Sequence, residues 1–96
     1  MSDTPPIEHE QGETKGRWFM RLGDGEAEMT YTRSGERTII IDHTGVPPSH
    51  RGEGLGEALV AHGVAEARER GLKIIPLCPF AKKEIMEHPE WRDVLK

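Results

Sequence analysis

The stretch HRGEGLGEAL, from His50 to Leu59, places three glycines in five residues and then continues into a pattern typical of a helix. Glycine begins a helix poorly unless the backbone there needs a conformation or an approach that a side chain would obstruct. The first-turn N–H groups of a helix have no intrahelical partners and carry partial positive charge, which suits a phosphate group. Arg51 adds a formal charge at the rim. The stretch therefore predicts a cradle for phosphate or pyrophosphate.

Three stretches before this loop have the composition of β-strands. GRWFMRL (Gly16–Leu22) is short and aromatic, and EAEMTYTR (Glu26–Arg33) alternates apolar and polar residues. RTIIIDHTGV (Arg37–Val46) is β-branched and nearly continuous, which is typical of a strand buried on both faces. Because short glycine-containing turns separate the three stretches, we predict an antiparallel three-stranded meander.

The residues after the loop predict a crossover to a parallel strand. Apolar residues recur at helical spacing over Leu55–Arg70, and Gly71 follows as a stop signal. Lys73–Leu77 reads as a short buried strand, and a strand–helix–strand crossover makes it parallel to the strand that ends near Val46. A second helix is expected over Phe80–His88, followed by a short C-terminal helix or coil. The fold class is α/β (α+β): meander, helix, parallel strand and C-terminal helix.

The length and composition indicate one small domain. The chain has 96 residues, of which 34% are hydrophobic, enough for one modest core. Apart from Ile7, residues 1–16 contain almost nothing that can enter a core. We therefore expect a disordered N-terminal tail over 1–16 and a single domain over 17–96.

The charge and cysteine content exclude several classes of function. The formal net charge of −4 disfavours nucleic-acid binding, because nucleic-acid binders usually have a basic face. Cys78 is the single cysteine, so an intrachain disulfide and a cysteine-only metal site are excluded, and we expect no metal. No apolar run approaches the ~18 residues of a membrane span. The N-terminus also lacks the apolar stretch of a secretory signal. We expect no membrane partner and a cytoplasmic location.

Two familiar phosphate loops do not fit the glycine pattern, and a third one does. A Walker loop requires Gly-Lys-Ser/Thr where this chain has Gly56-Glu57-Ala58. A dinucleotide fingerprint requires a third glycine at position 57, which is a glutamate. The pattern Arg-x-x-Gly-x-Gly, formed by Arg51, Gly54 and Gly56, resembles the acetyl-CoA pyrophosphate loop of the GNAT acetyltransferase superfamily.

Two flanking blocks carry the resemblance further. IDHTGVPPSHRGEGLGEALV (Ile41–Val60) and KIIPLCPFAKKEIMEHPEW (Lys73–Trp91) are similar to the small single-domain GNAT-like proteins. The resemblance extends from about Trp18 to Trp91. It implies a minimal GNAT-like fold in which Ile39–Val46 and Lys73–Leu77 splay apart, and it implies acetyl-CoA (coenzyme A) as the cofactor, with its pantetheine arm in the gap.

The resemblance also implies which residues contact the cofactor. The backbone of the strand end lines the arm, the glycine loop holds the pyrophosphate, and early residues of the last helix touch the cofactor. These cofactor-binding residues are Thr44, Gly45, Val46, Arg51, Gly52, Glu53, Gly54, Leu55, Gly56, Phe80 and Lys83.

Cys78 and His43 are the candidate catalytic residues. His43 is the natural general base, because its ordinary pKa is near 6.5; alternatively, its ring holds the strand end to a neighbour. Asp42 is expected on the opposite face of a regular strand, so it is not expected to pair with His43. Cys78 would lie near the acetyl end, as nucleophile, proton donor or contact, and otherwise is a small buried residue. His50, on the loop, is a further candidate for contact with phosphate.

The chain departs from larger members of the superfamily. It lacks the N-terminal helix pair and the last strands that help to form an acceptor pocket, and Phe80 stands where many relatives have a proton-donating tyrosine. The leading hypothesis is an acetyl-CoA-dependent N-acyltransferase acting on a primary amine, either a small molecule or a protein or peptide. The alternative is a non-catalytic CoA-binding module or sensor that works with a partner. A generic nucleotide-binding domain is a third hypothesis, and the sequence leaves the oligomeric state open.

Overall fold

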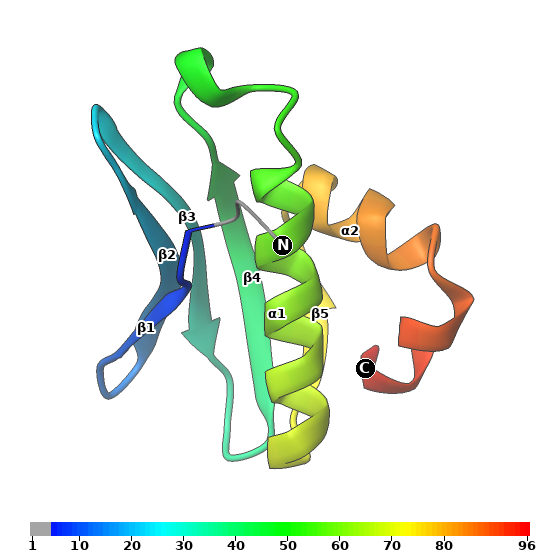
Figure 1. Ribbon diagram of the computed structural model, residues 1–96. Helices are drawn as coiled ribbons and strands as arrows, with labels where there is room; N and C mark the ends of the chain where they lie inside the picture. Colours follow the sequence, from blue (N-terminus) through cyan, green and yellow to red (C-terminus); the bar gives the residue numbers. More distant parts are fainter. Residues whose placement is uncertain (1–4) are drawn as a thin grey trace.

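The computed structural model describes residues 5–96, which form one five-stranded sheet with helices on one of its faces (Figure 1). The strands lie in the order of the chain, β1-β2-β3-β4-β5. The first four are antiparallel, and β5 is parallel to β4. The elements are β1 (Glu8–Gln11), β2 (Lys15–Leu22), β3 (Gly25–Arg33), β4 (Thr38–Gly45), η1 (Pro48–His50), α1 (Leu55–Arg70), β5 (Lys73–Pro76), α2 (Pro79–Met86) and η2 (Pro89–Val94). The predicted fold class is confirmed.

The meander has one strand more than the sequence predicts. Residues 8–11 were expected in a disordered tail, and that expectation is wrong, because β1 pairs with β2 from Glu8 opposite Phe19 to Gln11 opposite Gly16. β1 has no apolar residue that could signal a strand. Backbone pairing, ion pairs of Glu8 with Arg21 and of Glu10 with Arg17, and the side chain of His9 hold it instead. The part of the tail prediction that concerns residues 1–4 lies outside the described residues.

His9 anchors β1 to the core. Its ring stacks on Trp18, with the ring centroids 4.7 Å apart. Its Nε2 lies 2.6 Å from the hydroxyl of Tyr31, and its Nδ1 lies 3.2 Å from a carboxylate oxygen of Glu66 on α1. Glu66 also accepts a hydrogen bond from the indole N–H of Trp18. One polar side chain thus joins the first strand, two other strands and the helix.

Replacing His9 with alanine is therefore expected to destabilise the fold. The change removes two hydrogen bonds and leaves Glu66 with fewer partners, so we expect the free energy of unfolding to fall by about 1–2 kcal/mol. Urea unfolding followed by tryptophan fluorescence measures this loss, since Trp18 lies against the altered side chain. Unchanged stability would mean that the backbone pairing and the ion pairs of β1 hold the strand without His9.

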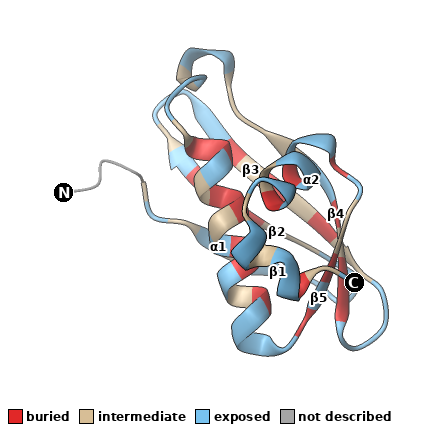
Figure 2. Cartoon of the chain, turned by 90° about the vertical axis from the view of Figure 1, so that its right-hand side faces the viewer, coloured by how far each residue is buried: buried red, intermediate tan, exposed pale blue. Residues whose placement is uncertain are grey.

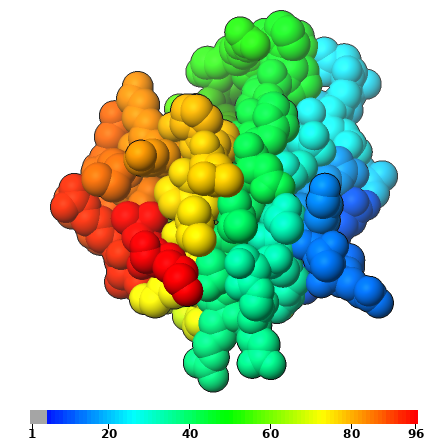
Figure 3. All heavy atoms as spheres, turned by 180° about the vertical axis from the view of Figure 1, so that it is seen from behind, coloured from blue at the N-terminus to red at the C-terminus, as the bar shows by residue number. Residues whose placement is uncertain are grey.

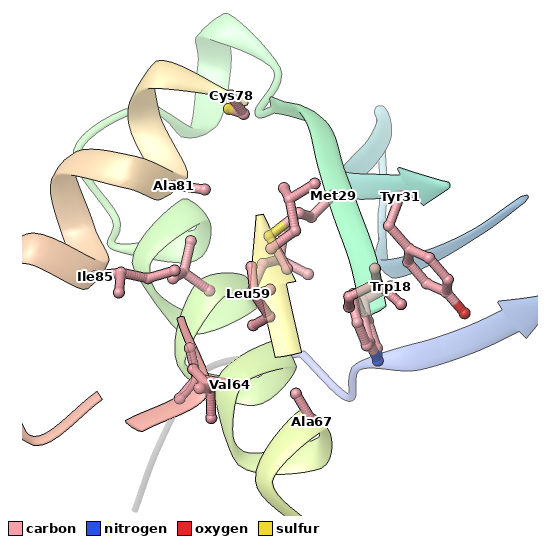
Figure 4. Close-up of a cluster of buried hydrophobic side chains, with 14 of the residues drawn as sticks. Trp18, Met29, Tyr31, Leu59, Val64, Ala67, Cys78, Ala81 and Ile85 are labelled. Carbon is pink, nitrogen blue, oxygen red and sulfur yellow. The ribbon is translucent and has the colours of Figure 1, made fainter. Parts of the chain in front are cut away.

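The core lies between the sheet and α1 (Figures 2 and 4). Trp18 and Met29 contribute from the strands, and Leu59 and Val64 contribute from the helix; all four are nearly inaccessible. Gly63 allows the close approach, since a Cβ there would lie 2.7 Å from Cε of Met29. Gly71, with a φ of 69°, ends the helix as predicted.

On the opposite face of the sheet, residues of the strands lie at the surface in the view from behind (Figure 3). β4 was expected to be buried on both faces, and that expectation is wrong. Ile39 and Ile41 are buried against α1, but Ile40 is only half-buried and Asp42 is exposed. Phe19 on the open face is covered instead by Arg17, whose guanidinium carbon lies 4.0 Å from the centre of its ring. No helix in the described part of the chain has the length and apolar character of a membrane span.

Candidate functional site

A cleft of about 450 Å³ lies where the end of β4, the loop after it and the start of α1 meet. Most of the predicted cofactor-binding residues come together in its wall, although they belong to three separate segments. The lining residues are His43, Thr44, Gly45, Val46, His50, Arg51, Gly52, Gly54, Leu55, Gly56, Glu57 and Phe80.

The cleft begins where β4 and β5 separate. Their pairing ends at Ile41 opposite Pro76, and the N–H groups of Leu77 and Cys78 both donate to the carbonyl of Ile41. Beyond that point β4 continues, paired only with β3. The residues that follow β5 turn away from β4 and form α2. The far end of β4 therefore has a free edge, and its backbone groups on that side are open to a ligand.

A bulge in β4 changes which side chains face the open side of the sheet. The register shifts by one residue where Tyr31 faces Ile41 and Thr30 faces His43. Asp42 accepts a hydrogen bond of 2.9 Å from Thr32, on the open face, and His43 lies on that face as well because it pairs with Thr30. The prediction that Asp42 and His43 point to opposite faces is therefore wrong, since it assumed a regular strand. The hydrogen-bond partner of Asp42 is Thr32 rather than His43.

The glycine loop and the first turn of α1 form the other end of the cleft. Gly52 and Gly54 have φ values of 85° and 78°, a backbone conformation that favours glycine. The first helical hydrogen bond runs from the N–H of Ala58 to the carbonyl of Gly54, and no side chain caps the helix. The N–H groups of residues 55–57 therefore have no intrahelical partners. Together with the exposed Arg51, they are a donor set that fits a diphosphate.

Gly56 has a different role from the two glycines before it. A Cβ at this position would lie 2.9 Å from Cζ of Phe80, so its absence lets the ring of Phe80 pack on the first turn of α1. Phe80 thereby forms a wall of the cleft. The backbone at Gly56 thus makes room for an aromatic ring of the protein itself.

The two candidate catalytic residues differ in access to the cleft. His43 is exposed and lines the cleft, and its Nε2 lies 2.9 Å from the position that a Cβ on Gly45 would occupy. Cys78 is only 5% exposed and is the N-cap residue of α2 (Figure 4). Its Sγ lies 3.5 Å from Oγ1 of Thr44, so it stands behind the cleft wall.

Three predicted contacts lie at the margin of the cleft or away from it. Lys83 is exposed on α2 and does not line the cleft, and neither does Glu53, whose carboxylate is bound to His50. His50 lines the cleft, but its ring faces carboxylates. Its Nε2 is 2.8 Å from Oδ1 of Asp24 and its Nδ1 is 3.1 Å from Oε1 of Glu53.

Asp24 is a residue that the sequence analysis missed. It lies in the turn between β2 and β3 and holds the loop by two hydrogen bonds, one to His50 and one of 2.5 Å from the hydroxyl of Ser49. These bonds hold the pKa of Asp24 below its ordinary value. An aspartate between two glycines reads only as a turn, so no local signal pointed to this contact.

Comparison with known proteins gives a consistent family. The model of the GCN5-related N-acetyltransferase family matches residues 17–94. The protein NATD1 of Gallus gallus and that of Homo sapiens are each 28% identical to this chain over 86 residues, which is 88% of this chain and 78% and 76% of the relatives.

Two solved structures resemble the fold. A GCN5-like protein from Staphylococcus aureus, a proposed N-acetyltransferase solved by NMR, has a TM-score of 0.74 and 35% identity, with 99% of this chain and 91% of that chain covered. A protein from Klebsiella pneumoniae, a proposed acyl-CoA N-acyltransferase, has a TM-score of 0.55 and 28% identity, with 67% of this chain and 46% of that chain covered.

The family match spans β4 and β5, the glycine loop and both helices that surround the cleft. It covers well over half of the chain, and the structural likeness covers nearly all of it. The chain belongs to the family of GCN5-related N-acetyltransferases.

Proposed function

We propose that this chain is an acetyl-CoA-dependent N-acyltransferase that acts on a primary amine. The observation that carries the proposal is the cleft, which joins a helix N-terminus with unpartnered N–H groups to the free edge of β4. The family membership supports the same reaction class. Unpartnered N–H groups at one end and a histidine at the other suit a ligand that is long, anionic at one end and reactive at the other.

The residues present fit coenzyme A. Arg51 and the N–H groups of the loop and first helical turn would hold the pyrophosphate, from Arg51 to Gly56. The backbone of Thr44–Val46, at the free end of β4 and just beyond it, would hydrogen-bond to the amides of the pantetheine arm, in the manner of an added strand. Phe80 would cover the arm from the side of α2. When bound, acetyl-CoA supplies an acetyl group activated as a thioester.

His43 would act as the general base. Its imidazole is exposed at the end of the cleft and faces the open side of the sheet, from which an amine has free access. The ring would take the proton of the amine as the nitrogen attacks the thioester carbonyl, and the thiolate of CoA would leave. Histidine is the side chain most often used for proton transfer near neutral pH.

Cys78 would support the reacting end through Thr44. Its Sγ–H donates to Oγ1 of Thr44, a residue of the cleft wall. Replacing Cys78 with alanine is expected to leave acetyl-CoA affinity intact and to lower kcat by about tenfold, the effect of a small displacement at a reacting centre. Steady-state kinetics measure this effect. A complete loss of turnover in the variant, together with an acetyl group on Cys78 of the wild-type protein by mass spectrometry, would instead assign Cys78 as the nucleophile.

A second candidate function is a CoA-binding module without turnover. Phe80 has no proton to donate, and the described residues place no second wall over the open face. Both features are consistent with a sensor that binds acetyl-CoA and depends on a partner protein. Binding of acetyl-CoA without any acceptor-dependent release of CoA would favour this candidate.

Thermal unfolding with acetyl-CoA, CoA, ATP and NAD tests the binding site first. A ligand at 100 times its dissociation constant adds about 2.7 kcal/mol of stability, which raises the melting temperature of a domain of this size by roughly 10 °C or more. We expect this shift only with the CoA species. CoA release is then measured with polyamines, amino acids and lysine peptides. If no amine accelerates release above hydrolysis in buffer, the enzyme proposal fails and the binding module remains.

A further inference from the structure

His50 lies between two carboxylates that belong to different parts of the fold. Asp24 approaches Nε2 from the turn between β2 and β3, at 2.8 Å, and Glu53 approaches Nδ1 from the glycine loop, at 3.1 Å. The neighbouring Ser49 donates a hydrogen bond to the other oxygen of Asp24. These contacts therefore join the loop that precedes α1 to the β2–β3 hairpin, which is distant from it in the sequence.

The geometry determines how many protons His50 carries. An ionised carboxylate only accepts hydrogen bonds, so each ring nitrogen of His50 has to donate one. Both nitrogens donate only in the protonated, positively charged ring. A neutral ring keeps one of the two bonds and turns a lone pair towards the other carboxylate, which is repulsive.

We propose that Asp24 and His50 are positioning residues for the phosphate loop, so that the charged ring fastens the loop in the conformation that binds a diphosphate and the affinity falls as the ring loses its proton. The proposal rests on the proposed binding of a CoA-type ligand to this loop. The proposal goes beyond that function because Asp24 and His50 act through the conformation of the loop and need not contact the ligand. It also predicts that the affinity for the ligand depends on pH.

The direction of the pKa shifts agrees with this arrangement. The hydrogen bonds to Glu53 and Asp24 raise the pKa of His50 above its ordinary value of 6.5. The bonds from Ser49 and His50 lower the pKa of Asp24. Because the pKa of His50 is raised on folding, its contribution is complete below pH 6.5 and is lost as the pH rises through the raised value. The affinity of the loop should therefore decline on the alkaline side of pH 6.5.

Isothermal titration calorimetry with dephospho-CoA, from about pH 6 to about pH 8.5, measures the effect. This ligand keeps the diphosphate but lacks the 3′-phosphate, whose second pKa near 6 would otherwise change the charge of the ligand in the same range. We expect the dissociation constant of the wild-type protein to rise about two- to fivefold, the effect of one exposed ion pair. His50→Gln and Asp24→Asn should bind more weakly at about pH 6 and show almost no dependence on pH. The control His62→Ala, on the exposed side of α1, should behave like the wild type.

Titration of the His50 ring by NMR tests its contacts with Asp24 and Glu53 in the absence of any ligand. We expect its pKa to lie above the ordinary value and to fall towards it in Asp24→Asn. An ordinary pKa in the wild type, no change in the variant, or affinity independent of pH would each overturn the inference. Absence of binding at every pH would contradict the proposed function of the loop. The proposed positioning role would then fail as well, even if NMR showed a raised pKa for His50.

Discussion

Replacing Gly54 with aspartate is expected to weaken the binding of acetyl-CoA by about a hundredfold or more. The residue lies directly before the first turn of α1, with a φ of 78°. The new carboxylate would stand beside the diphosphate and would also compete for the free N–H groups of the helix. Like charges placed together in an interface cost several kcal/mol, and each 1.4 kcal/mol corresponds to about a tenfold change in affinity. Calorimetry measures the loss.

Gly54→Asn is the matched control for this change. Asparagine has nearly the same shape and also tolerates a positive φ, but it has no charge. We expect Gly54→Asn to retain most of the affinity and both variants to remain folded, as followed by circular dichroism. Equal losses in the two variants would assign the effect to shape or backbone strain. Unchanged affinity in Gly54→Asp would show that the diphosphate does not bind at this end of the cleft.

Replacing His43 with alanine is expected to lower kcat by a hundredfold or more, while acetyl-CoA affinity stays unchanged. A positioned general base contributes about 10²–10⁴-fold to a rate, and the ring lies away from the phosphate loop. The rate of acetyl transfer to an amine, measured from pH 6 to 9, should lose in the variant the rise with pH that a general base confers. A variant that keeps the rate and pH profile of the wild type would assign His43 to a structural role.

Gly45→Ala tests the position of the same ring without removing it. A Cβ at Gly45 would lie 2.9 Å from Nε2 of His43, so the imidazole has to turn away from its place over the strand. Because the displaced atoms are the end of a side chain, we expect the fold and the acetyl-CoA affinity to survive. The rate should fall by about tenfold or more, since small displacements of a reacting group are costly. Full activity would show that the base does not need this position.

The features that local sequence could predict are those with local causes. The glycines before and in the first turn of the helix determine the local backbone, so the loop from Arg51 to Gly56 was predicted together with the helix. The crossover from β4 to β5 followed from composition and the handedness of such connections. The separation of the two strands at Ile41 also agrees with what the resemblance to the superfamily implies.

The features that the sequence could not predict depend on distant partners. β1 contains no apolar residue, and its anchor His9 is meaningful only once Glu66 and Tyr31 are in place. The common face of Asp42 and His43 depends on a bulge that is visible only in the register with β3. One of the two partners of His50 is Asp24, 26 residues away in the chain. Patterns within a single element carry no information about any of these pairings.

The order of the strands has a consequence for the way the chain folds and opens. The pairing of β3 with β4 closes a turn of only four residues, whereas β4 and β5 enclose the 27 residues that contain α1. Because loop closure costs about 0.6 kcal/mol for each doubling of length, the second closure is harder by about 2 kcal/mol.

The cleft is formed by this harder closure. The meander of β1–β4 contains mostly local contacts and can assemble early, while α1, β5 and the glycine loop join it later. A ligand bound between β4 and the first turn of α1 would act as a temporary cross-link across the segment that assembles last during folding. Amide hydrogen exchange in α1 and β5 should therefore slow on ligand binding far more than exchange in β2 and β3, and proteases should gain access to the crossover first when the cleft is empty.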